Sequence, residues 1–125
     1  MIISTIRINA APARKKEILE ILYSVKGPTE GQAGCLSSNI YQNLLSNHQI
    51  TYVEVWKTKA GLFKHIRSSL YRSILAAIDM SCELPDIQFS SVSATDGMEL
   101  IKAALSSIDS KSVSNGVLTQ KVLSR

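Results

Sequence analysis

The sequence lacks most features that mark metalloproteins, disulfide scaffolds or nucleotide-binding enzymes. Its 125 residues include two cysteines, Cys35 and Cys82, which have no ligand-like spacing and are too few for a disulfide scaffold. No glycine-rich phosphate cradle follows a strand, and neither cysteine is flanked by a nucleophile-elbow pattern. These absences give little support to nucleotide or acyl-enzyme chemistry, and we expect both cysteines to be reduced thiols.

A long apolar run is also missing. The chain is 45% hydrophobic, but no stretch approaches the roughly 20 residues that span a bilayer. The N-terminal stretch MIISTIRINA alternates like a strand and lacks the charged start and cleavage site of a secretory signal. A chain of this length builds one compact domain rather than two. We therefore expect a soluble cytoplasmic protein with no membrane partner.

The formal charge of +4 does not mark a nucleic-acid-binding surface. Residues 102–125 hold four basic residues against Asp109 alone, so most of the excess lies at the periphery of the chain. A domain that holds nucleic acid usually concentrates basic residues on a folded face, with aromatic residues beside them. We expect no nucleic-acid partner.

The sequence of the first half of the chain predicts a strand, a helix and then two further strands. Residues 2–8 are rich in β-branched side chains, which favours a first strand. Pro12 fits the first turn of a helix whose apolar stripe ends at Gly27-Pro28, and residues 28–34 read as a loop. Residues 35–43 and 49–56 then form a predicted hairpin.

The second half predicts a helix followed by a fourth strand. Helix signals begin at Thr58, weaken at Ser68-Ser69 and return before Pro85, so we expect one broken helix or two short ones. Residues 86–95 read as a strand, and Asp96 is a candidate cap for a short helix through Leu105. The order β-α-β-β-α-β predicts an α+β ferredoxin-like fold, an antiparallel sheet with helices on one face. We place this domain at residues 1–108 and a serine-rich tail at 109–125.

The stretch from Ile50 to His65 is the most informative part of the chain, because it joins a strand pattern to a helix pattern. Tyr52, Glu54 and Trp56 fall on one face of the strand, while Val53 and Val55 fall on the other, and neither face is typical of a solvent face. With Thr58 as the helix cap, His65 can come near Trp56 in space. The pattern therefore indicates a pocket.

The same residues carry a resemblance to a known family. The chain reads Y-x-E-x-W from Tyr52, then A-x-L-x-x-H from Ala60 to His65. This resembles the antibiotic biosynthesis monooxygenase family of dimeric α+β barrels, over roughly residues 2–95. The resemblance implies a homodimer whose two sheets face one another, with a small pocket in each subunit between sheet and helices. It implies a fold more firmly than one reaction, because relatives that look alike include oxygenases, isomerase-like enzymes, haem-degrading proteins and proteins with no known activity.

His65 is the candidate for proton transfer, since an imidazole near its ordinary pKa accepts a proton at neutral pH. The alternative is a histidine that caps or packs the helix. Glu54 would be costly to bury alone, and His65, Arg72 or Arg7 could pair with it, either to orient the imidazole or to hold the strand to a helix or to the other subunit. His48 lies in the hairpin turn, too far from His65 for a metal pair, so we predict no metal site.

Four further residues are candidates for substrate contact. Trp56 offers a large π-face and one N–H donor, although core packing explains it equally. Tyr52 and the apolar helix residue Phe63 would wall the same pocket. Arg72 closes a run of five basic residues without an acid, which could attract an anionic ligand or could simply be a solvated helix face.

These residues lead to one functional hypothesis and one alternative. The resemblance implies a cofactor-independent monooxygenase acting on a small electron-rich aromatic such as a quinol or anthrone, and the missing metal and dinucleotide motifs agree with the absence of a cofactor. In the alternative, the chain is a non-catalytic dimeric module that binds a small hydrophobic molecule or serves as an interaction platform.

Overall fold

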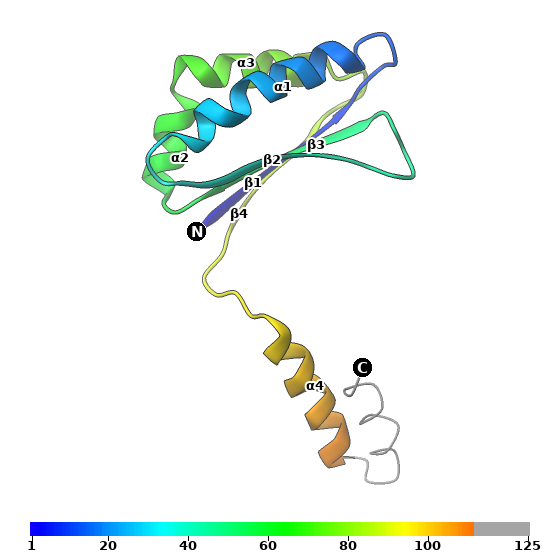
Figure 1. Cartoon of the computed structure of the whole chain (residues 1–125), viewed down its shortest axis with the longest axis vertical. Helices are drawn as coiled ribbons and strands as arrows, with labels where there is room; N and C mark the ends of the chain where they lie inside the picture. Colours follow the sequence, from blue (N-terminus) through cyan, green and yellow to red (C-terminus); the bar gives the residue numbers. More distant parts are fainter. Residues whose placement is uncertain (112–125) are drawn as a thin grey trace. The chain divides into compact units, whose positions relative to one another are not determined.

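The computed structural model describes residues 1–111, of which residues 1–93 form one compact unit (Figure 1). This unit contains four strands and three helices. The strands are β1 (Ile2–Asn9), β2 (Cys35–Gln42), β3 (Gln49–Trp56) and β4 (Asp86–Ser91), and the helices are α1 (Lys15–Glu30), α2 (Lys59–Ile66) and α3 (Ser69–Asp79). Their order confirms the predicted β-α-β-β-α-β arrangement, with its last helix divided in two.

The strands form an antiparallel sheet in the order β2-β3-β1-β4, and the three helices cover one of its faces (Figure 1). Along β1 and β3, buried and half-buried residues alternate because successive side chains point to opposite faces. Ile50, Tyr52 and Trp56 share one strand face, as the alternation predicted, and all three are fully buried under the helices. On the opposite, open face, Ile3 lies beside Val55 and Thr5 beside Val53.

The prediction that the first helix ends at Gly27-Pro28 is wrong. Helix α1 continues to Glu30 with Pro28 inside it. Proline removes one backbone N–H from the helix ladder, but here it lies within the last turn, where little helix remains to be broken. Thr29 is fully buried in this last turn, and the chain leaves the helix at Gly31, whose N–H bonds to the carbonyl of Gly27 at 3.1 Å.

The predicted interruption in the second helical region is confirmed. Thr58 caps α2, since its Oγ1 accepts a hydrogen bond from the backbone N–H of Gly61 at 3.1 Å. Helix α2 ends at Ile66, and α3 begins at Ser69 after the Ser68 Oγ has donated a hydrogen bond to the carbonyl of His65. The break between the two short helices therefore follows closely after His65, the candidate for proton transfer.

Residues 94–125 belong to a second unit, of which α4 (Met98–Lys111) is described. The helix starts close to the predicted Asp96 cap and runs beyond the predicted end near Leu105. The predicted tail from residue 109 lies almost entirely outside the described residues. Within residues 1–111, no helix is long and apolar enough to cross a membrane.

Candidate functional site

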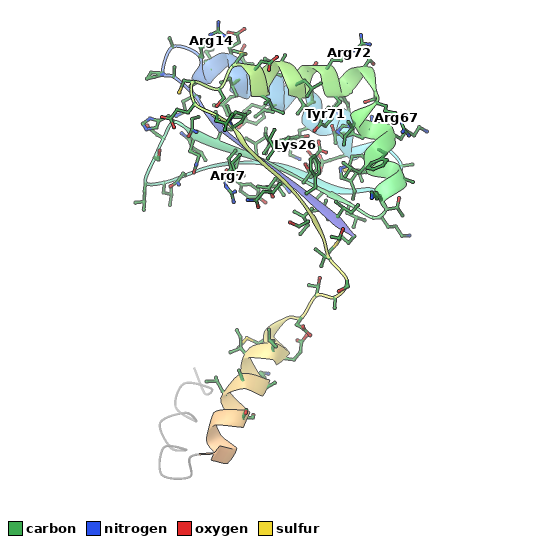
Figure 2. The ribbon with its side chains drawn as sticks, turned by 180° about the vertical axis from the view of Figure 1, so that it is seen from behind. Arg7, Arg14, Lys26, Arg67, Tyr71 and Arg72 are labelled. Carbon is green, nitrogen blue, oxygen red and sulfur yellow. The ribbon has the colours of Figure 1, made fainter. Side chains whose placement is uncertain are left out.

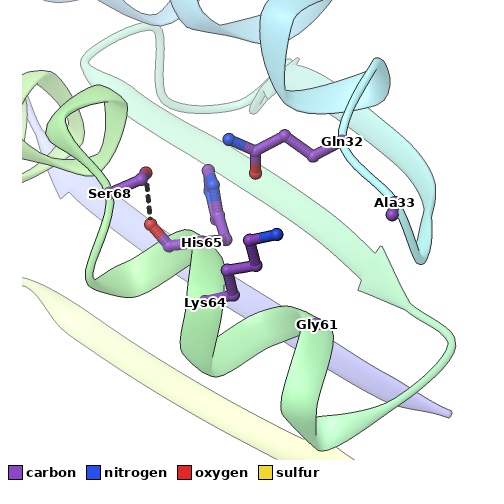
Figure 3. Close-up of a pocket in the computed structure, with 6 residues that line it drawn as sticks. All are labelled: Gln32, Ala33, Gly61, Lys64, His65 and Ser68. Atoms are coloured by element: carbon purple, nitrogen blue, oxygen red, sulfur yellow. Dashed lines mark hydrogen bonds between the residues drawn. The ribbon is translucent and has the colours of Figure 1, made fainter.

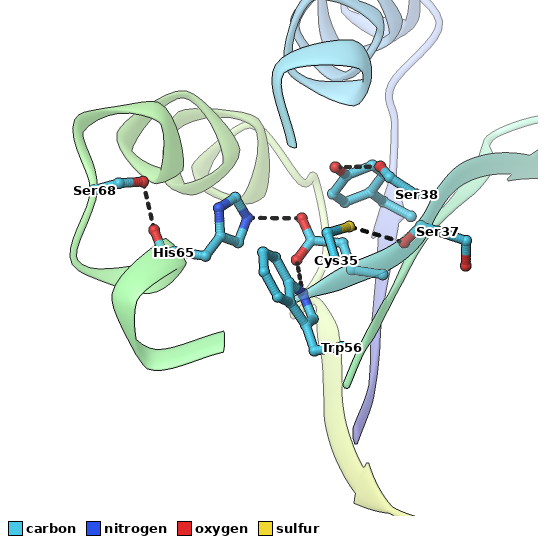
Figure 4. Close-up of polar contacts among 8 residues, drawn as sticks. Cys35, Ser37, Ser38, Trp56, His65 and Ser68 are labelled. Carbon is cyan, nitrogen blue, oxygen red and sulfur yellow. Dashed lines mark hydrogen bonds and ion pairs between the residues drawn. The ribbon is translucent and has the colours of Figure 1, made fainter. Parts of the chain in front are cut away.

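The centre of the site is the buried carboxylate of Glu54, which bridges β3 to α2. The dashed lines that leave His65 and Trp56 in Figure 4 mark these two contacts. Its Oε1 accepts a hydrogen bond from Trp56 Nε1 at 2.9 Å, and its Oε2 lies 2.9 Å from His65 Nε2. All three side chains are at most 1% exposed. The sequence alternation explains the first contact, because Glu54 and Trp56 are two residues apart on one strand face.

This arrangement selects one tautomer of the neutral imidazole. An ionised carboxylate has only acceptor sites, so the ring proton of neutral His65 lies on Nε2, toward Glu54. Nδ1 then carries a free lone pair. It is buried and has no hydrogen-bond partner among the residues that the structure describes. In Figure 4 this nitrogen lies on the side of the ring away from the carboxylate. The geometry is that of a base oriented by a second residue.

Aromatic rings hold the imidazole in place. The Trp56 ring lies 4.8 Å from the His65 ring, centre to centre, at 30°, and the Tyr71 ring meets it edge-on at 5.2 Å. Burial, followed by the negative charge of Glu54, raises the pKa of Tyr71 to about 12. Tyr71 therefore stays a neutral phenol at physiological pH and cannot act as a base in place of His65.

Two other titratable side chains near Glu54 are excluded from ionised roles for the same reasons. Burial and the Glu54 charge raise the pKa of the Cys35 thiol, which leaves it protonated and unreactive as a nucleophile. Tyr52 donates or accepts a 2.7 Å hydrogen bond with Ser38, and burial followed by the Glu54 charge raises its pKa. His65 differs from these neighbours in presenting, beside a cavity, a ring nitrogen without a partner among the described residues.

A cavity of about 210 Å³ opens beside His65 (Figure 3). Its lining comes from the loop after α1, from one side of α2 and from the link between α2 and α3: Gln32, Ala33, Gly61, Lys64, His65 and Ser68. Among these, Gln32 also has a buried polar atom, Oε1, without a hydrogen-bond partner. Sequence reasoning found His65, and included Lys64 in the basic run that could attract an anionic ligand. It missed the other four, because none stands in a motif.

Two glycines allow the loop and the helix to approach each other. Gly34 has a φ of 87°, a conformation that side chains disfavour, and its carbonyl accepts a 2.8 Å hydrogen bond from the N–H of Lys57. A Cβ at Gly61 would lie 3.4 Å from both the Ala33 carbonyl oxygen and the Trp56 ring. The turn at Gly34 and the missing side chain at Gly61 therefore place Gln32 over the imidazole.

The predicted substrate-contact residues do not all reach this cavity. Trp56 and Tyr52 are 0% exposed and lie behind Glu54 and His65 as part of the core. Phe63 is 44% exposed and lines a separate cavity of about 320 Å³ with Leu62 and Phe89. Arg72 is exposed on the outer side of α3 and points away from the sheet, whereas its neighbour Tyr71 points inward (Figure 2). Neither Phe63 nor Arg72 lines the His65 cavity.

The described residues contain no group of three or more histidine, cysteine, aspartate and glutamate side chains that could hold a metal ion. His48 is exposed in the hairpin loop and belongs to no such group with the buried His65.

Comparison with known proteins identifies relatives over most of the first unit. The family model described as antibiotic biosynthesis monooxygenase matches residues 1–77. An uncharacterized protein of Synechocystis is 22% identical over 68 residues, which are 54% of this chain and 46% of that protein. The match thus spans about half the length of this curated relative.

Solved structures share the fold. A candidate antibiotic biosynthesis monooxygenase from Deinococcus radiodurans has a TM-score of 0.70 at 16% identity, covering 78% of this chain and 97% of its own. Rv0793 from Mycobacterium tuberculosis has a TM-score of 0.69 at 14% identity, covering 77% and 98%. A conserved protein of Methanosarcina mazei has a TM-score of 0.66 at 23% identity, covering 71% and 89%. At these identities the likeness concerns the fold, which is the predicted ferredoxin-like one.

Proposed function

Because the chain belongs to the antibiotic biosynthesis monooxygenase family, we propose that it is a cofactor-independent monooxygenase of a small, single-ring phenol or quinol. The observation that carries the proposal is the lone pair of His65 Nδ1, which is fixed by Glu54 at Nε2 and borders a cavity. The family supports a monooxygenase role, and the cavity supports the substrate class.

The first step is proton transfer. His65 Nδ1 takes the hydroxyl proton of the substrate, and the imidazolium that forms is stabilised by the Glu54 carboxylate at 2.9 Å. The resulting phenolate lies near Lys64, whose ammonium group attracts the negative charge. Since the imidazole side chain is 0% exposed, a substrate reaches Nδ1 by displacing a lining side chain, and Lys64 is the long, exposed one.

The electrons for oxygen reduction come from the substrate itself. The phenolate passes one electron to O₂, and the two radicals combine to form a carbon–oxygen bond at the ring. His65 then returns its proton to the outer peroxide oxygen, the O–O bond breaks, and water leaves as the ring carbon loses its hydrogen. A dihydroxybenzene and O₂ thus give a hydroxyquinone and water, with all four electrons supplied by the ring.

The cavity volume favours one ring over three. Sites for drug-sized ligands occupy roughly 300–1,000 Å³, and the His65 cavity has about 210 Å³. We therefore place single-ring phenols and quinols before anthrones among the candidate substrates.

We expect purified protein, free of added metal or flavin, to raise oxygen uptake with single-ring quinols above the uncatalysed rate. An oxygen electrode with a panel of hydroquinones, catechols and anthrones provides the measurement, and incorporation of ¹⁸O from ¹⁸O₂ into the product separates oxygenation from simple oxidation to the quinone. Uptake equal to the protein-free rate across the panel would contradict the proposal.

A non-catalytic binding module is the second candidate, and one observation favours it. Glu54, Trp56 and His65 form a buried hydrogen-bonded cluster that ties β3 to α2, which is sufficient to explain their presence without chemistry. In that case a phenol binds beside His65, but oxygen uptake stays at the protein-free rate.

We also propose that two copies associate through the open face of the sheet. Within residues 1–93, Ile3, Val53 and Val55 are half-buried there without a covering layer, and Tyr41 is 54% exposed on the same face. An apolar face of this kind is typical of an interface. Two copies would bury it in a homodimer.

Light scattering at micromolar concentration should give about twice the 13.7 kDa chain mass. Val53→Arg places a charge in the middle of the open face and should yield monomers, while the control Leu75→Arg, on an exposed position of α3, should leave the dimer intact. A wild-type particle of single-chain mass would refute the dimer.

A further inference from the structure

Two buried hydrogen-bond acceptors border the His65 cavity and lack partners among the described residues. One is Nδ1 of His65, in the tautomer that Glu54 selects, and the other is Oε1 of Gln32. His65 comes from α2 and Gln32 from the loop after α1, yet both line one cavity, and Figure 3 shows the Gln32 amide turned toward the imidazole. Buried polar atoms without partners are uncommon and need an explanation.

The chemistry of the two atoms defines what satisfies them. Two acceptors cannot bond to each other, so each requires a separate donor hydrogen from a third group. A ligand with a single hydroxyl satisfies one acceptor and leaves the other buried and unpaired, which is costly. A ligand with two hydroxyls satisfies both.

The size of the cavity adds a constraint on where those hydroxyls lie. With about 210 Å³ available, a single ring presents one edge to His65, and Gln32 approaches that same edge from the loop (Figure 3). A hydroxyl on the opposite side of the ring points away from both acceptors. Hydroxyls on adjacent ring carbons point to both.

We propose that Gln32 is a specificity-determining residue that selects vicinal dihydroxybenzenes. His65 Nδ1 accepts one hydroxyl hydrogen, and Gln32 Oε1 accepts the hydrogen of the neighbouring hydroxyl. The proposal deepens the proposed function, because it names the substrate class of the same cavity.

The test measures binding without turnover. Calorimetric titration of the full chain under argon compares catechol with hydroquinone, its isomer, and with phenol, which lacks the second hydroxyl. We expect catechol to bind about tenfold more tightly than either, which corresponds to one additional hydrogen bond of ordinary strength. In Gln32→Met, which keeps the length of the side chain but removes the acceptor, the ratio should fall to about one.

Gln88→Met serves as the matched control, because Gln88 lies on β4, away from the cavity lining, and its substitution should preserve the tenfold ratio. A catechol preference that survives in Gln32→Met, or no preference in the wild type, overturns the inference. Absence of binding by all three compounds also overturns it and indicates that water alone fills the cavity. A Gln32-dependent preference without oxygen uptake sustains the inference and overturns only the monooxygenase proposal.

Discussion

Glu54→Leu should cost about 2–6 kcal/mol of unfolding free energy, because it leaves two buried donors unsatisfied at about 1–3 kcal/mol each. Leucine is similar in size to glutamate but accepts no hydrogen bond, so Trp56 Nε1–H and His65 Nε2 lose their common partner inside the core. Since small proteins are stable by only about 5–15 kcal/mol, this is a large fraction of the total. Urea unfolding monitored by circular dichroism measures it.

The control is Glu83→Leu at an exposed position, which should change stability by less than about 0.5 kcal/mol. A double-mutant cycle with His65→Leu isolates the contact, because the double variant should lose less than the sum of the two single losses. A Glu54→Leu loss below about 1 kcal/mol would mean that the carboxylate does not hold the strand to the helix.

Glu54→Gln distinguishes stability from orientation. Glutamine has one acceptor oxygen and one donor nitrogen, so it can accept from Trp56 and donate to His65 Nε2. That reversal places the imidazole proton on Nδ1 and removes the lone pair from the cavity. Glu54 is therefore a positioning residue, whose amide variant retains the fold but reverses the tautomer on which the proposed base depends.

The sequence predicted the fold because its signals are local and periodic. Alternation along β1 and β3 predicted which residues share a face, and Thr58 and Ser68 marked helix boundaries that the structure confirms. The error at Pro28 is one of position: proline removes one backbone N–H from the helix ladder, but α1 continues past it to Glu30 before it ends.

The site was only partly predictable, because half of it depends on tertiary contact. Glu54, Trp56 and His65 were found since the first two share a strand face and the third follows within one strand–helix unit. Gln32 was missed because only the turn at Gly34 and the small Gly61 bring its loop to α2. Phe63 was placed in the wrong cavity because two residues along a helix are roughly 200° around its axis, which puts it opposite His65.

The largest expected effect on activity is that of His65→Ala. A positioned general base contributes about 10²–10⁴-fold, so the substitution should reduce oxygen uptake with a single-ring quinol to near the protein-free rate. His48→Ala is the matched control, because His48 is exposed in the hairpin loop and touches no part of the cavity. Initial rates in the oxygen electrode, normalised to folded protein by circular dichroism, provide the comparison.

The reason for the loss can be separated from unfolding by chemical rescue. Alanine leaves space for a small base beside Glu54, so added imidazole should restore part of the uptake in His65→Ala and have no effect on the wild type. The restored rate should rise with pH through the ordinary pKa of imidazole, since only the neutral form accepts a proton. If His65→Ala folds and consumes oxygen as fast as the wild type, the substrate loses its proton to solvent rather than to this ring, and Glu54 and Trp56 serve the core alone.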